Sequence, residues 1–187
     1  MREKLSPILA MEAVILTCFS IYIREDIEMA SPEEGLRQAA RSALVQCMGV
    51  SAGESVLVII DEELREIGYA FWREAKNLGA EAIIVEMAPR SQDGEEPPEP
   101  VACIMSEADV ILAPTSRSLS HTLARRKANA AGARVASMPG ITKDSAIRTL
   151  TADYGRIAKL SEKIAQIMTA GTSARIMTSR GTDITLS

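Results

Sequence analysis

The chain has 187 residues, of which 47% are hydrophobic and 25% are charged, and this composition is sufficient to bury a core. The formal net charge of -4 argues against a nucleic-acid-binding protein, because phosphate neutralisation needs a clustered basic surface. The basic cluster Arg125-Arg126-Lys127 is short, and we expect it to be a solvated helix face.

The cysteine and histidine content limits the possible metal sites. The cysteines Cys18, Cys47 and Cys103 are widely spaced in apolar surroundings, as expected of reduced core residues in a cytoplasmic protein. There is a single histidine, and neither a CxxC nor an HExxH motif occurs. We therefore expect no complete metal site within this chain and a cytoplasmic location.

Residues 1–28 do not resemble the remainder of the chain. An apolar segment at 13–23 invites interpretation as a signal peptide or membrane anchor, but its uninterrupted run is too short to span a bilayer. Glu12 interrupts its upstream side, and no small-residue cleavage site follows cleanly. An upstream extension or an extra helix is the better interpretation, and no membrane partner is expected.

The first helix of the main body is predicted to begin beside Ser31. Ser31 would be the N-cap, Pro32 the first helical residue and Glu34 the third, which completes a capping box. Met29 then suits a natural start, and Gly49 a left-handed end of the helix.

From residue 55 onward, apolar runs alternate with amphipathic stretches. The expected strands are 55–60, 82–85, 110–113 and 134–138; the expected helices are 62–78, 99–107, one from about 119 to 131, and 142–170 with a break near 151–153. This alternation predicts an α/β fold with a doubly wound, mostly parallel sheet, a three-layer sandwich of the Rossmann or flavodoxin type. No GxGxxG follows the first strand, so no nucleotide is expected.

Two features at strand ends have more than one interpretation. Asp61 either caps the next helix, which the N-cap preference of Asp favours, or contacts a ligand. The polar, proline-rich loop 88–98 is either a mobile flap or a solvated connector.

The polar loop after strand 110–113 is the main candidate for a working surface, because ligands of open α/β sheets bind at the carboxyl ends of strands. Its candidate residues are Thr115, Ser116, Arg117, Ser118, Ser120 and His121. They are predicted either to form a hydrogen-bonding rim or to serve as ordinary loop residues, with Ser118 or Ser120 capping the next helix. The guanidinium fork of Arg117 suits a carboxylate.

The tail reads as two strands, 173–178 and 182–186, around a Ser179-Arg180-Gly181 turn. A hairpin alone is marginally stable, so we expect it to open another sheet. The predicted division is an extension at 1–28, an α/β domain at 29–171 and the first strands of a truncated carboxyl-terminal domain at 172–187.

Four stretches of this sequence are similar to a known enzyme family. They are Gly53–Ile60, Ala108–Thr122, Met138–Thr142 and Gly181–Leu186. Together they resemble the amino-terminal half of the thermophilic metalloaminopeptidases of the aminopeptidase T type, over about residues 29–187.

The resemblance implies the lid and oligomerisation half of a two-domain peptidase that releases N-terminal residues from peptides. It implies a pair of divalent metals, zinc, cobalt or manganese, which activates water. Glu, His and Asp side chains of the missing carboxyl-terminal domain would hold these metals, so no catalytic residue and no metal ligand is assigned here. It also implies a homo-oligomer.

Two alternatives remain open. The first is the corresponding half of an iron-dependent dioxygenase that opens dihydroxypyridine rings, a relative within the same superfamily. The second is a non-catalytic α/β binding module.

Overall fold

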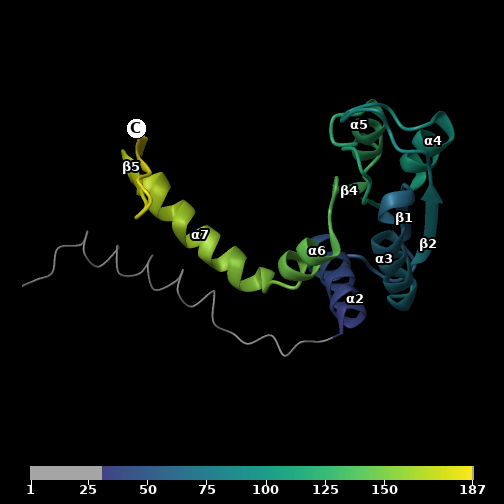
Figure 1. Ribbon diagram of the computed structural model, residues 1–187, viewed down its shortest axis with the longest axis horizontal. Coiled ribbons are helices and arrows are strands. Elements are labelled where there is room, and N and C mark those ends of the chain that lie inside the picture. The colour runs from purple at the N-terminus through teal and green to yellow at the C-terminus, as the bar shows by residue number, and fades with distance from the viewer. Residues whose placement is uncertain (1–30, 187) are drawn as a thin grey trace, which may run out of the picture. The chain divides into compact units, whose positions relative to one another are not determined.

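A computed structural model describes residues 31–186 (Figure 1). The chain divides into two units between Glu33 and Glu34, and the elements below belong to the second unit together with the first residues of its opening helix. The predictions for residues 1–28, for Met29 as a start and for Cys18 lie outside the described residues.

The elements follow the predicted order. The helices are α2 (Pro32–Ser42), which continues into a π-helical turn (Ala43–Cys47), then α3 (Arg65–Asn77), preceded by a 3-10 turn (Glu62–Leu64), α4 (Glu99–Glu107), α5 (Leu123–Ala130), α6 (Lys143–Leu150) and α7 (Tyr154–Ala170). The strands are β1 (Ser55–Ile60), β2 (Glu81–Glu86), β3 (Val110–Ala113), β4 (Arg134–Ser137), β5 (Ala174–Met177) and β6 (Asp183–Leu186). The predicted break between α6 and α7 is confirmed.

The first four strands form a parallel sheet in the order β2-β1-β3-β4. Val58 in β1 is paired with Ile84 on one side and with Leu112 on the other. β5 and β6 form a separate antiparallel hairpin. The predicted fold class is therefore confirmed: an α/β chain with helices against a parallel sheet, followed by a hairpin.

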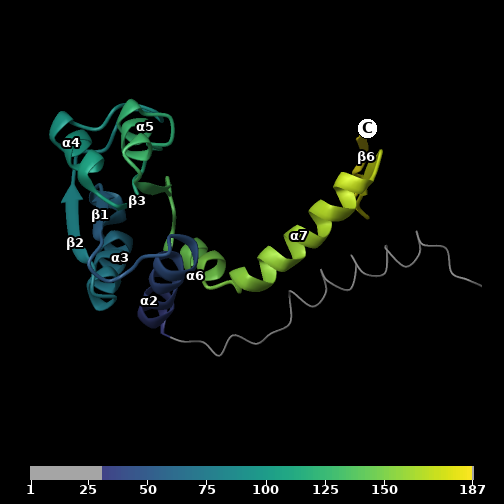
Figure 2. The same ribbon diagram turned by 180° about the vertical axis from the view of Figure 1, so that it is seen from behind.

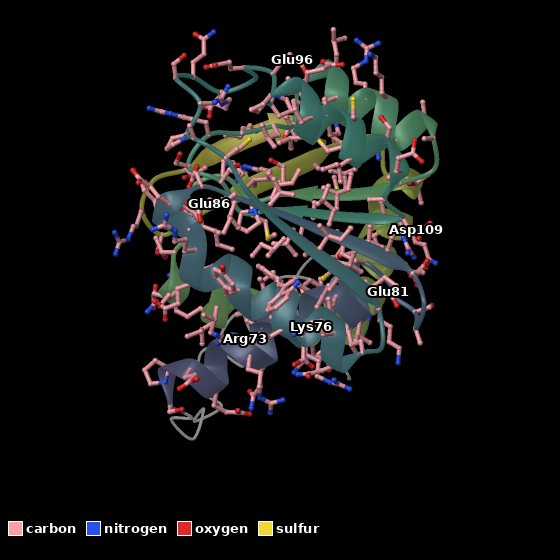
Figure 3. All side chains as sticks on the ribbon, turned by 90° about the vertical axis from the view of Figure 1, so that its right-hand side faces the viewer. Arg73, Lys76, Glu81, Glu86, Glu96 and Asp109 are labelled. Carbon is pink, nitrogen blue, oxygen red and sulfur yellow. The ribbon has the colours of Figure 1, made fainter. Side chains whose placement is uncertain are left out.

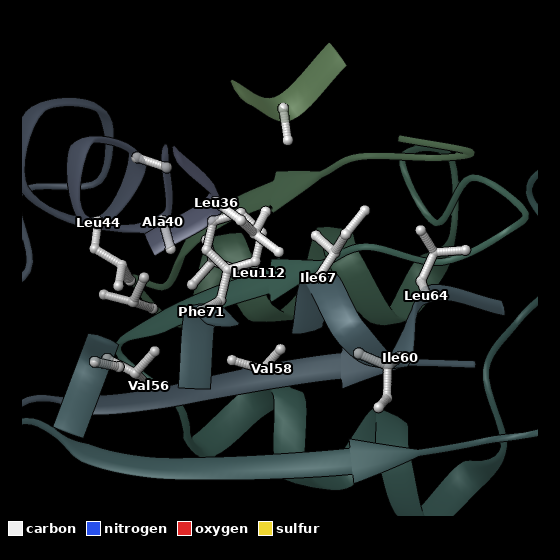
Figure 4. Packing of buried hydrophobic residues seen from close by; sticks show 14 of the residues in the cluster. Leu36, Ala40, Leu44, Val56, Val58, Ile60, Leu64, Ile67, Phe71 and Leu112 are labelled. Atoms are coloured by element: carbon white, nitrogen blue, oxygen red, sulfur yellow. The ribbon is translucent and has the colours of Figure 1, made fainter. Parts of the chain in front are cut away.

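Helices cover both faces of the sheet (Figures 1 and 2). On one face, Leu36 and Leu44 of the first helix and Phe71 of α3 pack with Val58, as Figure 4 shows. On the opposite face, side chains of α4 and α5 such as Met105 pack with the alternate strand residues. Because β1 and β3 are covered on both sides, they read as unbroken apolar runs. β2 lies at the sheet edge and shows mixed exposure.

Glycines end the first two helices of the sheet domain. Gly49 and Gly79 have φ values of +59° and +80°, a region that side chains with a Cβ rarely occupy. The left-handed end predicted at Gly49 is therefore confirmed.

Several local predictions were wrong. Cys47 and Cys103 are exposed rather than in the core, because each lies on the outward side of its helical segment. The helix predicted from about residue 119 begins at Leu123, since residues before it form a turn.

The carboxyl-terminal elements expose apolar side chains. The described α7 has no buried residue, and Ile164 and Ile167 are exposed. In the hairpin, Ile176 and Ile184 are opposite each other and each is 50% exposed. The domain boundaries at 29–171 and 172–187 stay a prediction. Within residues 31–186, no helix is both long enough and apolar enough to cross a bilayer.

Candidate functional site at the carboxyl ends of the strands

The strand order reverses between β1 and β3. β1 is followed through α3 by the neighbour on one side, β2, and the chain then crosses to β3 on the other side of β1. In open α/β sheets, ligands bind outside the carboxyl ends of the strands at such a reversal. The residues that follow β1 and β3 are Asp61 and the Thr115–Ser116 turn, so this edge is the candidate site.

Asp61 joins the two strand ends. Its Oδ2 accepts hydrogen bonds from both the backbone N–H and the Oγ–H of Ser116, each at 2.6 Å. Asp61 occupies the N-cap position of the 3-10 turn, as predicted, but its side chain makes no capping hydrogen bond. The residue is 1% exposed, and its Oδ1 is buried without a hydrogen-bond partner among the described residues.

The turn after β3 is fixed by its own hydrogen bonds. Thr115 is buried, and its hydroxyl donates to the carbonyl of Arg117 at 2.6 Å. The carbonyl of Thr115 accepts from the N–H of Gly140 at 2.9 Å, which ties the turn to the segment after β4. The buried Thr115 therefore fixes the backbone conformation of the rim, while Ser116 donates to Asp61.

The long loop 88–98 is fastened to the rim through Ser118. The N–H of Ser118 donates to Asp93 Oδ1, and its carbonyl accepts from the N–H of Gly94, both at 2.8 Å. Within the loop, Glu95 accepts from the hydroxyl and the N–H of Ser91. These hydrogen bonds, with that of the hydroxyl foremost, hold the pKa of Glu95 below its usual value. The loop is thus a structured neighbour of the rim.

The beginning of α5 is occupied by a carboxylate from the same loop. Glu96 accepts from the N–H of Leu123 through Oε1 at 2.5 Å and from the N–H of Ala124 through Oε2 at 3.1 Å. Thr122 is the N-cap, because its hydroxyl accepts from the N–H of Arg125 at 3.2 Å. Sequence reasoning missed both residues. Glu96 lies 27 positions upstream of Leu123, so no local pattern could indicate this contact.

The remaining predicted rim residues have different surroundings. Ser118 and Ser120 do not cap α5; instead the hydroxyl of Ser118 accepts from the N–H of Ser120 at 3.2 Å. The carbonyl of Ser120 accepts from Arg125 Nε at 2.9 Å. Arg117 and His121 are exposed, and among the described residues their side chains make no hydrogen bond or ion pair. These two cationic or basic groups are therefore free to contact a ligand or another domain.

The opposite edge of the sheet is occupied by structural contacts. Figure 3 shows Glu81 and Asp109 at the amino-terminal ends of the strands and Glu86 at the other end. Asp109 Oδ2 accepts from the N–H of Ser55 at 2.8 Å and from its hydroxyl at 2.7 Å. These hydrogen bonds, with the backbone one foremost, lower the pKa of Asp109. The carboxylate of Asp109 is therefore engaged by Ser55, whose hydroxyl also accepts from the N–H of Asp109 at 2.9 Å.

A shallow hollow of about 210 Å³ lies between α4 and α5. Its lining includes Cys103, Leu123 and Lys127, and none of the predicted rim residues belongs to it. Leu123, at its margin, is 58% exposed.

The described residues do not fit a metal centre. No group of three or more His, Cys, Asp or Glu side chains within residues 31–186 is arranged to hold an ion. Within the same residues the side chain of His121 makes no hydrogen bond to a serine or cysteine that it could activate as a general base. The arrangement can therefore hold a polar group by hydrogen bonds, and no step through a metal is derived for it.

No protein-family model matches the sequence, and no curated protein matches it. Among solved structures, the chain is similar to 2,5-dihydroxypyridine dioxygenase from Pseudomonas putida, with a TM-score of 0.57 and 16% identity over 84% of this chain and 48% of that one. It is also similar to wild-type AmpT from Thermus thermophilus, with a TM-score of 0.44 and 15% identity over 74% of this chain and 49% of that one. The chain spans about half the length of each. At these identities the similarity shows the fold alone.

Proposed function

We propose that this chain is the amino-terminal half of a metal-dependent aminopeptidase of the aminopeptidase T type, with its metal centre on a carboxyl-terminal domain. The observation that carries the proposal is the resemblance of the loop 108–122 and of the Met138-Pro139-Gly140 turn to that family. The structure brings these two stretches together, because the N–H of Gly140 donates to the carbonyl of Thr115. The shared motifs therefore form one edge of the sheet.

In this proposal the chain covers the cleft that binds the peptide and contributes contacts to the peptide, while the metal centre of the carboxyl-terminal domain hydrolyses it. The proposal assigns no metal ligand to this chain. Arg117 is exposed and unpaired within the described residues, so its guanidinium is available for a carboxylate of a peptide. His121 is available as a donor or acceptor in the same way.

The second candidate is the corresponding half of an iron-dependent dioxygenase that opens dihydroxypyridine rings. It is favoured by the similarity of the fold to 2,5-dihydroxypyridine dioxygenase over 84% of this chain. Both candidates place the metal outside this chain, so its own residues do not separate them. A binding module without catalysis is the third candidate.

The test uses the protein in which this chain is followed by its carboxyl-terminal domain. It is assayed for hydrolysis of aminoacyl anilides with zinc, cobalt or manganese, and for ring opening of 2,5-dihydroxypyridine with ferrous iron. The proposal expects metal-stimulated hydrolysis and no ring opening. Ring opening alone would establish the second candidate, and neither activity would favour the binding module.

A matched pair of variants tests the role of the rim. Arg117→Ala removes an exposed guanidinium from the rim, whereas Arg126→Ala removes an exposed guanidinium from the solvated face of α5. We expect the first to lower kcat/KM for the anilide and the second to leave it unchanged. Equal kinetics for the two variants would remove Arg117 from the proposed substrate contacts.

A further inference from the structure

The carboxylate of Asp61 is buried with only half of its hydrogen-bonding capacity used. Ser116 supplies both donors to Oδ2, and Oδ1 is buried without a partner among the described residues. A buried acceptor that lacks a partner is costly, so native proteins normally supply one. The missing partner must be a hydrogen-bond donor, because a carboxylate oxygen only accepts.

The same carboxylate lacks a counter-charge. No ion pair within the described residues includes Asp61, although the glutamate buried on α3, Glu74, is paired with Arg41 at 2.7 Å. Buried charges in proteins are generally paired, and a buried charge without a partner is strongly destabilising. A group that carries both positive charge and N–H donors would satisfy both needs at once.

Asp61 also occupies the position at which this fold binds ligands. It follows β1, and its partner Ser116 follows β3, so the two residues lie on either side of the reversal in strand order. Ser116 is partly exposed, whereas Asp61 is not.

We propose that Asp61 is a binding residue for the primary ammonium group of a small amine, with Oδ1 accepting an N–H of the ammonium and Ser116 Oγ adjoining it. A metal ion suits this position less well, because Asp61 and Ser116 supply too few oxygen ligands for one and no cluster of three or more His, Cys, Asp or Glu side chains within residues 31–186 is arranged to hold an ion. The inference is independent of the peptidase proposal, since it concerns residues of this chain alone.

The test follows the backbone amide at position 116 by NMR, because this N–H donates directly to Asp61. The 187-residue chain is titrated with methylammonium chloride and, in parallel, with tetramethylammonium chloride, a cation of equal charge that has no N–H donor. We expect a saturable shift of the amide signal with methylammonium and none with tetramethylammonium. Equal responses to the two salts, or no saturable response to either, would overturn the proposal.

Asp61→Asn is the matched variant. The amide oxygen can still accept from Ser116, while the charge is lost and an N–H donor replaces the free acceptor. We expect the affinity for methylammonium to fall by about tenfold or more, as for the loss of a hydrogen bond to a charged group. Unchanged affinity would contradict the assignment of the site to Asp61.

A second variant keeps the inference testable if Asp61→Asn does not fold. Ser116→Ala removes the hydroxyl donor but keeps the carboxylate and the backbone N–H. We expect it to bind methylammonium still, because Oδ1 remains available and Oδ2 loses one competing donor. Loss of binding in Ser116→Ala alongside a native-like spectrum would show that the carboxylate is not the acceptor.

Discussion

A methyl group added at Gly68 should destabilise the sheet domain, because α3 lies very close to β1 at this point. A Cβ built at Gly68 would be 2.1 Å from Cγ2 of Ile60, whereas carbon atoms in contact are separated by about 3.5–4.0 Å. Ile60 is 1% exposed and β-branched, so its side chain has little freedom to rotate away. Figure 4 shows Ile60 beneath Leu64 of the 3-10 turn and Ile67 of α3.

The magnitude follows from two opposing effects. Alanine is more favourable than glycine inside a helix by about 1 kcal/mol. Overpacking a filled core costs about 1–3 kcal/mol, and the approach of 2.1 Å in this structure places Gly68→Ala at the upper end. We therefore expect a net loss of about 1–2 kcal/mol in the free energy of unfolding.

Urea unfolding followed by circular dichroism measures this loss. Gly155→Ala on α7 is the control, because the nearest atom to its built Cβ is Asp153 Oδ1 at 3.4 Å. The control should not lower the unfolding midpoint. In a double-mutant cycle, Ile60→Ala removes the colliding methyl group and should cancel most of the additional cost of Gly68→Ala. Stability of Gly68→Ala equal to or above that of the parent chain would refute the close approach of α3 to β1.

Two further predictions concern the carboxylates of Glu96 and Asp109. Glu96→Ala should lower the free energy of unfolding by about 1 kcal/mol, because it removes the acceptor of two N–H groups at the start of α5. Glu107→Ala is the control, and urea unfolding measures both variants. An equal loss of stability in the two variants would contradict the hydrogen bonds from the N–H groups of α5 to Glu96. The pKa of Asp109 is lowered in the folded chain, so its contribution to stability is present above its ordinary pKa and is lost as pH falls through the lowered value. The stability difference between the parent chain and Asp109→Asn should therefore be constant from about pH 5 to pH 8 and should shrink below about pH 4. A series of urea titrations across this pH range measures the difference. If it stayed independent of pH down to acid unfolding, that result would contradict the hydrogen bonds from Ser55.

The fold could be predicted from the sequence because its signals are local. The apolar run of β1, the amphipathic period of α3 and the glycines after the helices each depend on neighbouring residues. The alternation of strands and helices then leaves few topologies, and the parallel sheet follows.

The site could be predicted only in part, because its contacts are long-range. The sequence placed the polar residues 115–121 at the carboxyl end of β3, which the structure confirms. It placed Asp61 at an N-cap position but could not show that its side chain accepts from Ser116, 55 positions away, instead of from the following turn. In the same way, the cap of α5 was assigned to serines near its start, whereas Thr122 and the distant Glu96 satisfy its N–H groups.

The central claim is that the metal centre of the proposed peptidase lies outside this chain. Metal analysis after equilibrium dialysis of the 187-residue chain against zinc, cobalt or manganese tests it most directly, with aminoacyl anilide turnover measured on the same samples. The account predicts that the chain retains no stoichiometric metal and hydrolyses no anilide, whereas the protein carrying its carboxyl-terminal domain does both. Stoichiometric metal and metal-stimulated hydrolysis by the 187-residue chain itself would contradict it.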